Sequence, residues 1–342
     1  MSRRLPSFLT VTLALGVAGV GLIAGPAFAD SQSPSTCVTA CTAVFTTAGS
    51  TPTFVVPNGI TSLTVTVTGA KGAEASSSIQ VSGTQGGPGG STTVDLGAVA
   101  GGTTYQVTVG NIGEGSSVSR AGTLLVVAGG GGQAGFLGRL NLPDQVSGDF
   151  AGGTGGSPTG PGVFAGTDGT TPNGTTENGH GGAVAAGGAA GTGDTNGTDG
   201  TNPNTTSIVA GGAGASEVVP VQDPPNPDVP TTFTAGNGGS GYSGGGGGAI
   251  TRGLLDGDGN PFDVVGGGGG GSGFLAPGLT ATAGTLNSTT TGSVTFTYSF
   301  PALAATGSIV PLWVPVGAAI LMALGVLLIV LRRRFAPGRA RH

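Results

Sequence analysis

The sequence predicts an all-β fold between two targeting segments. Residues 62–68 and 293–300 alternate apolar, largely β-branched or aromatic side chains with Ser and Thr, which is typical of strands with one buried face. Shorter segments of the same kind are residues 93–96, 105–109 and 124–127. No segment outside the chain ends has the period of an amphipathic helix, so an antiparallel sandwich is the default way to bury these strands.

Glycine dominates the region between the predicted strands at residues 124–127 and 293–300. Residues 129–273 mix Gly with Ala, Thr, Ser, Asn, Asp and Pro, and contain unbroken glycine runs at 129–132, 244–248 and 266–271. The Gly-X-Y period of collagen is absent. Composition alone allows a flexible linker. Because strands bracket the region and apolar residues adjoin the runs, we expect ordered segments that hydrogen-bond to one another instead.

A family resemblance supports this expectation. The series of motifs at residues 54–70, 86–90, 107–110, 125–132 and 266–274 resembles the glycine-rich domain of anaplastic lymphoma kinase and its bacterial secreted relatives. The resemblance covers roughly residues 52–300. It implies a tumour-necrosis-factor-like β-sandwich with an insertion of packed, left-handed polyglycine II helices. Such helices have three residues per turn and no internal hydrogen bonds, so their backbone groups must pair with neighbouring segments.

The chain departs from this family pattern at residues 143–237. Thr, Asn, Asp and Pro dilute the glycine there, most clearly at residues 220–230. We expect this part to be looped out or disordered. The ligand-binding role of the kinase family is not carried over to this chain.

The N-terminal segment has the layout of a secretory signal peptide. Arg3 and Arg4 supply the positive start, residues 8–24 the apolar middle, and Ala27 and Ala29 the small-x-small cleavage pattern. We expect a signal peptidase to cut before Asp30. An uncleaved N-terminal anchor is the alternative, because the apolar stretch is long for a signal.

The C-terminal segment contains three parts in the order of a cell-wall sorting signal. The pentapeptide is Leu303, Ala304, Ala305, Thr306 and Gly307, followed by an apolar run at residues 309–331 and then Arg332, Arg333 and Arg334. At 1.5 Å per residue the run can cross a hydrocarbon core of about 30 Å. The arginines place its far end in the cytoplasm.

The pentapeptide resembles the LPxTG-type substrates of sortases, and more closely the LAxTG variant of actinobacterial class E sortases. That resemblance implies attack on the Thr306 carbonyl by a cysteine transpeptidase. The Thr306–Gly307 bond would break, and Thr306 would be joined to peptidoglycan as the covalent acceptor. The excess of arginine over lysine also indicates an actinobacterial, Gram-positive source.

These observations divide the chain into six parts. They are a signal peptide (1–29), a Ser/Thr-rich lead with the cysteine pair (30–50), a glycine-rich β domain (51–300), the sorting motif region (301–308), a transmembrane helix (309–331) and a basic cytoplasmic tail (332–342).

Charge and cysteine usage limit the partners of the exported part. All 16 acidic residues of the chain lie in it, against four basic ones, Lys71, Arg120, Arg139 and Arg252. An acidic exterior without a basic patch argues against nucleic acid or anionic lipid as a partner. In an exported chain, Cys37 and Cys41 favour a structural disulfide over free thiols or pairing with another chain, provided that a turn brings them together.

No catalytic constellation is apparent. His180 lies in a glycine tract with nothing nearby in the sequence to orient it, so a surface-loop histidine is the favoured interpretation. A calcium site is a weaker candidate, because Asp256, Asp258 and Asn260 place oxygen ligands at alternate positions, with Asp263 close by. The EF-hand pattern then fails at Pro261 and Gly267, which favours a solvated turn. We expect no cofactor and no enzymatic activity.

The sequence therefore favours a non-enzymatic surface protein, exported to the cell wall and displaying a glycine-rich β module in a structural or adhesive role. A glycan- or protein-binding module is the alternative, with Tyr105, Tyr242 and Tyr298 as the scarce aromatic contacts, although Tyr105 and Tyr298 lie in predicted strands where packing is favoured. A wall-associated enzyme is a further alternative. The expected partners are a sortase, a signal peptidase and peptidoglycan.

Overall fold

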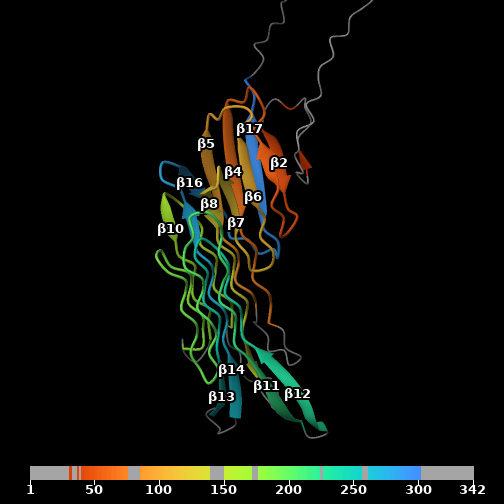
Figure 1. Cartoon of the computed structure of the whole chain (residues 1–342). Helices are drawn as coiled ribbons and strands as arrows, with labels where there is room; N and C mark the ends of the chain where they lie inside the picture. Colours follow the sequence, from red (N-terminus) through yellow and green to blue (C-terminus); the bar gives the residue numbers. More distant parts are fainter. Residues whose placement is uncertain are drawn as a thin grey trace, which may run out of the picture.

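The structure is a computed structural model that describes residues 31–32, 37, 40–75, 85–138, 150–171, 176–223, 226–255 and 261–301. Within these ranges the chain is all-β, with antiparallel sheets and no helix. Figure 1 shows an elongated molecule with two sheets at one end, extended segments in the middle and hairpins at the other end. The prediction of an all-β fold is confirmed.

The first sheet joins strands from both ends of the described chain. Its order is β1 (Ser31–Gln32), β2 (Cys41–Phe45), β17 (Ser293–Ser299), β4 (Ser62–Thr68), β5 (Ser91–Gly97) and β16 (Thr280–Ala283). β4 and β17 pair in unbroken antiparallel register from Ser62 opposite Ser299 to Thr68 opposite Ser293. The two segments with the clearest alternation in the sequence are therefore neighbours in one sheet, although they lie near opposite ends of the domain.

The second sheet is built from the strands nearest the glycine runs. Its order is β10 (Gly162–Phe164), β15 (Gly273–Leu275), β8 (Thr123–Ala128), β7 (Ser116–Arg120), β6 (Thr104–Thr108) and β3 (Thr53–Val55), all antiparallel. The predicted strands at 105–109 and 124–127 correspond to β6 and β8. β7 is not predicted by the sequence pattern, because three of its five residues are serine and the alternation is hidden.

The two sheets pack on one shared apolar core. Phe54 of the second sheet stacks on Phe296 of the first with ring centroids 4.1 Å apart. Phe45 meets the same ring edge-on, and Tyr105 meets it at a tilt. All four rings are at most 1% exposed, so β17 contributes the residue on which the aromatic part of the core converges.

Strand β2 corrects the sequence-based division of the chain, which assigned residues 30–50 to a lead outside the β domain. Cys41, Ala43 and Phe45 point into the core and are at most 1% exposed, while Thr42 and Val44 point outward. The strand pairs with β17 from Cys41 opposite Tyr298 to Phe45 opposite Val294. Two of its three inward side chains are small, which made the alternation too weak to recognise.

The glycine runs are ordered, and their hydrogen bonds repeat every three residues. From Gly129 to Ala134 each backbone amide donates to another segment, and amides three residues apart donate to the same one. The pairs are Gly129 with Gly156 and Gly132 with Gly153, Gly130 with Ser240 and Gln133 with Asn237, and Gly131 with Ala70 and Ala134 with Ala73, all at 2.8–3.0 Å. This is the bonding that packed polyglycine II helices require.

A second run shows the same repeat. Gly266, Gly269 and Ser272 donate to Ala249, Gly246 and Ser243, while Gly268 and Gly271 donate to Gln133 and Gly130. None of the glycines in the three runs is among those with positive φ. We call this hydrogen-bonded set of extended segments, residues 69–75, 85–90, 129–135, 150–215 and 235–249 where described, and 266–272, the glycine lattice. The prediction that the runs are ordered rather than flexible is confirmed.

Glycine is required in the lattice because neighbouring backbones touch. A Cβ added at Gly132 would lie well under 3.0 Å from the carbonyl of Gly268, and one added at Gly268 would meet the carbonyl of Asn237 in the same way. Real Cβ atoms are not found so close to a backbone oxygen. The absence of side chains is thus what allows amides and carbonyls of separate segments to reach hydrogen-bonding distance.

The expectation that residues 143–237 are looped out or disordered is wrong for the described part of this region. Gly188 and Gly191 donate to Gly244 and Gly247, and Gly212 donates to Gly245, each at 2.7–2.9 Å. The proline-rich run at 220–230 belongs to a hairpin of β11 (Ser216–Asp223) and β12 (Asn226–Thr234). The region is diluted in glycine because it forms the surface of the lattice, where side chains have room.

Apolar residues close the lattice at the end away from the two sheets. A three-stranded sheet, β13 (Ile250–Leu255), β14 (Pro261–Val265) and β9 (Phe136–Gly138), lies there with the β11–β12 hairpin (Figure 1). Its small cores are Phe136, Ala215, Phe233, Ala235, Ile250 and Val265, and Leu137, Phe150, Phe262 and Val264. The extended segments therefore run between two apolar ends that hold them in register.

We predict that Gly268→Val destabilises the protein by about 3 kcal/mol, because the branched side chain must push apart backbones that are hydrogen-bonded. The free energy of unfolding should be measured by denaturant titration, together with amide exchange at residues 129–132. Gly160→Val is the matched control, since a Cβ there meets nothing within 4 Å. Equal stability of the two variants would contradict a close-packed lattice.

We predict that the protein loses stability at alkaline pH because the buried Tyr105 phenol ionises. Burial raises the pKa of Tyr105 above its ordinary value of 10.0, while the charge and hydrogen bond of Arg120 act in the opposite direction with less effect. The neutral phenol is favoured in the fold, so its stabilising contribution is complete below pH 10.0 and is lost as pH rises through the raised pKa. Denaturant titrations of the protein and of Tyr105→Phe should therefore diverge only at alkaline pH. Parallel curves would contradict the assignment.

Candidate functional site

The C-terminal end of the described β domain emerges on the side away from the glycine lattice. Thr68 of β4 leads into the lattice at Gly69, whereas Ser299 of β17 lies opposite Ser62 at the other end of the sheet. Pro301, the last described residue, follows there. The disulfide between Cys37 and Cys41, with Cα atoms 5.7 Å apart, lies at the same end, because Cys41 is paired with Tyr298.

The predicted sorting motif, Leu303, Ala304, Ala305, Thr306 and Gly307, lies outside the described residues. So do the signal peptide at 1–29, the apolar run at 309–331 and the tail at 332–342. Among the residues that the structure does describe, no helix is long and apolar enough to cross a membrane. Attachment and export therefore remain predictions from the sequence.

The calcium candidate is described only at its edge. Asp256, Asp258 and Asn260 lie outside the described residues, in the connection between β13 and β14. Asp263 is described, and its carboxylate accepts a hydrogen bond from the amide of Gly253 at 2.9 Å across this hairpin. Within the described ranges, no cluster of three or more His, Cys, Asp or Glu side chains could hold a metal ion.

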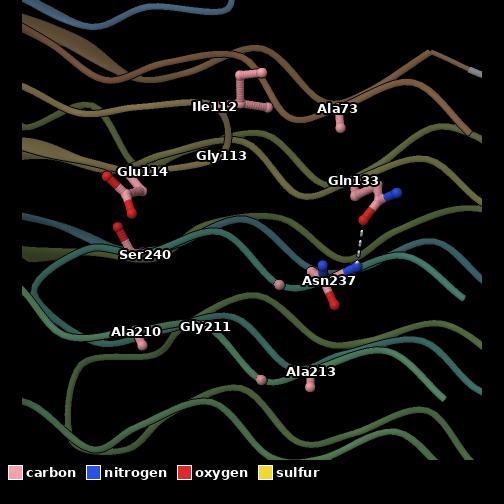
Figure 2. A pocket seen from close by; sticks show the side chains of 12 residues that line it. Ala73, Ile112, Gly113, Glu114, Gln133, Ala210, Gly211, Ala213, Asn237 and Ser240 are labelled. Carbon is pink, nitrogen blue, oxygen red and sulfur yellow. Dashed lines mark hydrogen bonds between the residues drawn. The ribbon is translucent and has the colours of Figure 1, made fainter. Parts of the chain in front are cut away.

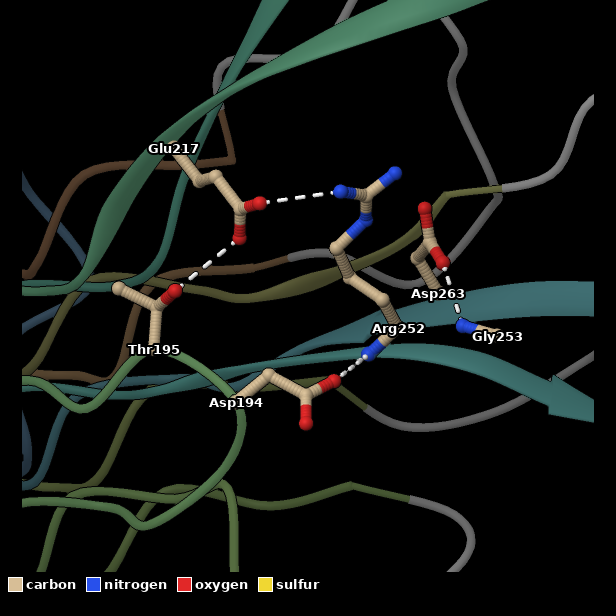
Figure 3. A network of polar contacts seen from close by, with 6 residues as sticks. All are labelled: Asp194, Thr195, Glu217, Arg252, Gly253 and Asp263. Carbon is tan, nitrogen blue, oxygen red and sulfur yellow. Dashed lines mark hydrogen bonds and ion pairs between the residues drawn. The ribbon is translucent and has the colours of Figure 1, made fainter.

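A polar network at the end of the lattice joins three separate segments around Arg252 (Figure 3). The Arg252 guanidinium donates to Glu217 of β11 at 3.0 Å, and the Arg252 amide donates to Asp194 at 2.8 Å. The other Glu217 oxygen accepts from the Thr195 hydroxyl at 3.0 Å. The network fixes the β11–β12 hairpin against β13 and so sets the direction in which that hairpin projects.

His180 has a partner that is not apparent from the sequence, Asp168. The statement that nothing orients this histidine is wrong, because Asp168 lies 3.0 Å from its Nδ1 and also accepts the Gly181 amide at 2.8 Å. His180 and Asp168 come from adjacent lattice segments twelve residues apart, which no local pattern reveals. No hydroxyl or thiol among the described residues is hydrogen-bonded to the imidazole, so this pair lacks a nucleophile.

Asp168 illustrates how the lattice surface is closed. Outward-facing amides that have no further segment to pair with are capped by oxygen atoms of polar side chains. These pairs are Gly181 with Asp168, Ala190 with Asp199, Gly187 with Asn202, Ala213 with Thr198, Gly214 with Asn237 and Asn237 with Gln133. The Asn, Asp and Thr residues that dilute the glycine therefore replace a missing neighbour.

A surface depression crosses the lattice face. It has a volume of about 430 Å³ and lies between Ile112 and Ala73 on one side and residues 210–213 on the other (Figure 2). Gln133 reaches across its floor to the Asn237 amide at 3.3 Å, and Asn237 in turn caps Gly214 at 2.8 Å. These side chains occupy the amides of Asn237 and Gly214, which are therefore not available to a further glycine-rich strand.

The three tyrosines do not form an aromatic platform. Tyr105 and Tyr298 are 1% and 4% exposed and belong to the core between the sheets, as their positions in predicted strands indicated. Tyr242 is half-buried and stacks on Phe274 with ring centroids 4.4 Å apart. A glycan surface built by stacking on these rings is therefore not present.

Comparison with other proteins adds no assignment. The chain matches no protein-family model, and no curated protein matches it.

We predict that Asn237→Ala destabilises the lattice face by about 1 kcal/mol, the usual cost of losing a side-chain cap on a backbone amide. Amide exchange at Gly214 should accelerate, because the Asn237 Oδ1 that accepts this amide is removed. Asn237→Asp keeps an oxygen acceptor in place and should leave the exchange rate slow. Unchanged exchange in Asn237→Ala would contradict the capping role.

Proposed function

We propose that this protein is a non-enzymatic surface protein, exported by its signal peptide and attached to peptidoglycan at Thr306 by a sortase of class E type. The observation that best supports this proposal is the place where the chain leaves the β domain. Pro301 leaves the β domain at the end opposite the lattice and the hairpins, with one residue, Ala302, between it and the sorting motif. Attachment just beyond Pro301 would hold the two sheets near the wall and direct the lattice outward.

The architecture is suited to structural display. A lattice whose segments are mutually hydrogen-bonded and closed by apolar residues at both ends acts as a rigid spacer rather than a tether. We propose further that the two sheets form the tumour-necrosis-factor-like sandwich that the family resemblance implies. The adjacency of the strands nearest the two ends of the domain, β2, β4 and β17, supports this proposal.

A glycan-binding module is the second candidate function. It is favoured by a cleft of about 340 Å³ on the second sheet, lined by uncharged side chains of β3, β6 and β7, rather than by the tyrosines. A catalytic role has no comparable support, because His180 and Asp168 lack a nucleophile among the described residues.

We predict that cell walls digested with muralytic enzymes release a chain that begins at Asp30 and ends at Thr306, joined to a peptidoglycan fragment. Mass spectrometry of the terminal peptides identifies both ends. Thr306→Ala should abolish the linked species and leave the chain in the membrane fraction, since the attacked carbonyl is no longer presented in the motif. Recovery of the unaltered protein only from membranes, with Arg332 to Arg334 still attached, would refute wall attachment.

A further inference from the structure

The outer face of the second sheet carries a cleft that the proposed display role does not use. It has a volume of about 340 Å³ and lies between strands β3, β6 and β7 and the segment 206–208. Along β6 the side chains of Tyr105 and Val107 enter the core, so Gln106 and Thr108 face outward into this cleft. The side chains that line it are thus placed by the alternation of a strand whose other face is fixed by the core.

The polar wall is continuous across three strands. Thr53 of β3 lies opposite Gln106 of β6, which lies opposite Ser119 of β7. In the next row, Thr108 lies opposite Ser117. Hydroxyl and amide groups from neighbouring strands therefore converge on one space.

The covering segment is tied to the sheet at one point and braced by hydrogen bonds of its own. Thr205 accepts a hydrogen bond from the Leu124 amide at 3.3 Å, which ties the segment to β8. The Asn204 side chain accepts both the amide and the hydroxyl of Thr206 at 2.9 and 2.8 Å. Because Ile208 and Leu124 add an apolar part to the lining, the cleft combines hydroxyl groups with a small apolar surface.

The Ser117 hydroxyl in this cleft has no hydrogen-bond partner among the described residues. The Ser117 side chain is 4% exposed and lines the cleft. Its neighbour Ser119 reaches Gln106 only at 3.4 Å. Buried hydroxyls are normally paired, so Ser117 points to a partner that enters from outside.

The chemistry of the lining limits what that partner is. Every lining side chain is uncharged, which gives no preference for an anion, a cation or a metal. The backbone groups of β6 and β7 pair with one another, so an added peptide strand has no ladder to join on this face. Hydroxyl groups both donate and accept, and they match a ligand that does the same at several positions. The volume is at the lower end of the range for small-molecule sites, about 300–1,000 Å³.

We propose that this cleft binds one unit of a neutral sugar. The inference does not depend on attachment of the chain to the wall, so either proposal can fail alone.

The test is a binding titration of the full-length chain with glucose, galactose, mannose and arabinose, with glucuronic acid as the charged comparison. Saturation-transfer NMR detects binding, and shifts of residues 106–108 and 117–119 give the Kd. At least one neutral sugar should bind in the millimolar range and more tightly than glucuronic acid. Thr108→Val and Ser117→Ala should each weaken binding about three- to tenfold, the effect of one lost hydrogen bond.

Thr104→Val is the matched control, because Thr104 lies on the same strand and the same outward face but does not line the cleft. It should leave the Kd unchanged. The proposal is overturned if no neutral sugar of the panel binds, if glucuronic acid binds as tightly, or if both cleft variants bind as well as Thr104→Val. Amide spectra of each variant confirm that the fold is retained, so a loss of binding reports on the cleft.

Discussion

Backbone hydrogen bonding between separate glycine segments is the constraint on which this structure depends. An extended segment with three residues per turn forms no hydrogen bonds within itself, so every amide of the lattice needs a partner from another part of the chain. Ordering glycine costs more conformational entropy than ordering any other residue.

The segments must therefore be held in register by other interactions, and the apolar residues at the two ends of the lattice provide them. Gly129 to Gly135 run from β8 to β9, and Gly266 to Ser272 run from β14 back to β15. Each run is fixed at both ends by buried strands.

The same requirement explains the surface of the lattice. An interior segment has neighbours on all sides and needs glycine, whereas an outer segment has one open side and unpaired amides. There the chain carries Asn, Asp, Thr and Gln, whose oxygen atoms accept those amides, as Asn237 does for Gly214 and Asp199 for Ala190. Edge strands of sheets are protected against further pairing by comparable devices. The capped surface is polar, because the capping groups are carboxylates, amides and hydroxyls.

The sequence predicted what depends on local alternation and missed what depends on distant neighbours. Strands β4, β6, β8 and β17 have β-branched or aromatic residues at alternate positions, and all four were found. β2 and β7 were missed because Ala and Ser hide the same alternation. Order in the glycine runs could be inferred from their position between strands. The role of residues 150–237 could not be inferred, since their Asn, Asp and Thr side chains cap amides of other segments, and the sequence does not show which amides lie beside them. The prediction that nothing orients His180 was wrong for the same reason, because its partner Asp168 comes from a neighbouring segment of the lattice.

The lattice face and the cleft on the second sheet differ in whether their polar groups already have hydrogen-bond partners. On the lattice face, the side chains of Gln133 and Asn237 at the 430 Å³ depression are already engaged as caps of backbone amides. On the second sheet, backbone groups are used in the ladder, yet Ser117 remains buried without a partner among the described residues. A folded chain tolerates such a hydroxyl when something outside the protein can satisfy it, since burying it unpaired costs about 1–3 kcal/mol. The sugar site that we propose therefore lies on the sheet that carries the uncapped hydroxyl, and not on the lattice face where the polar side chains cap amides.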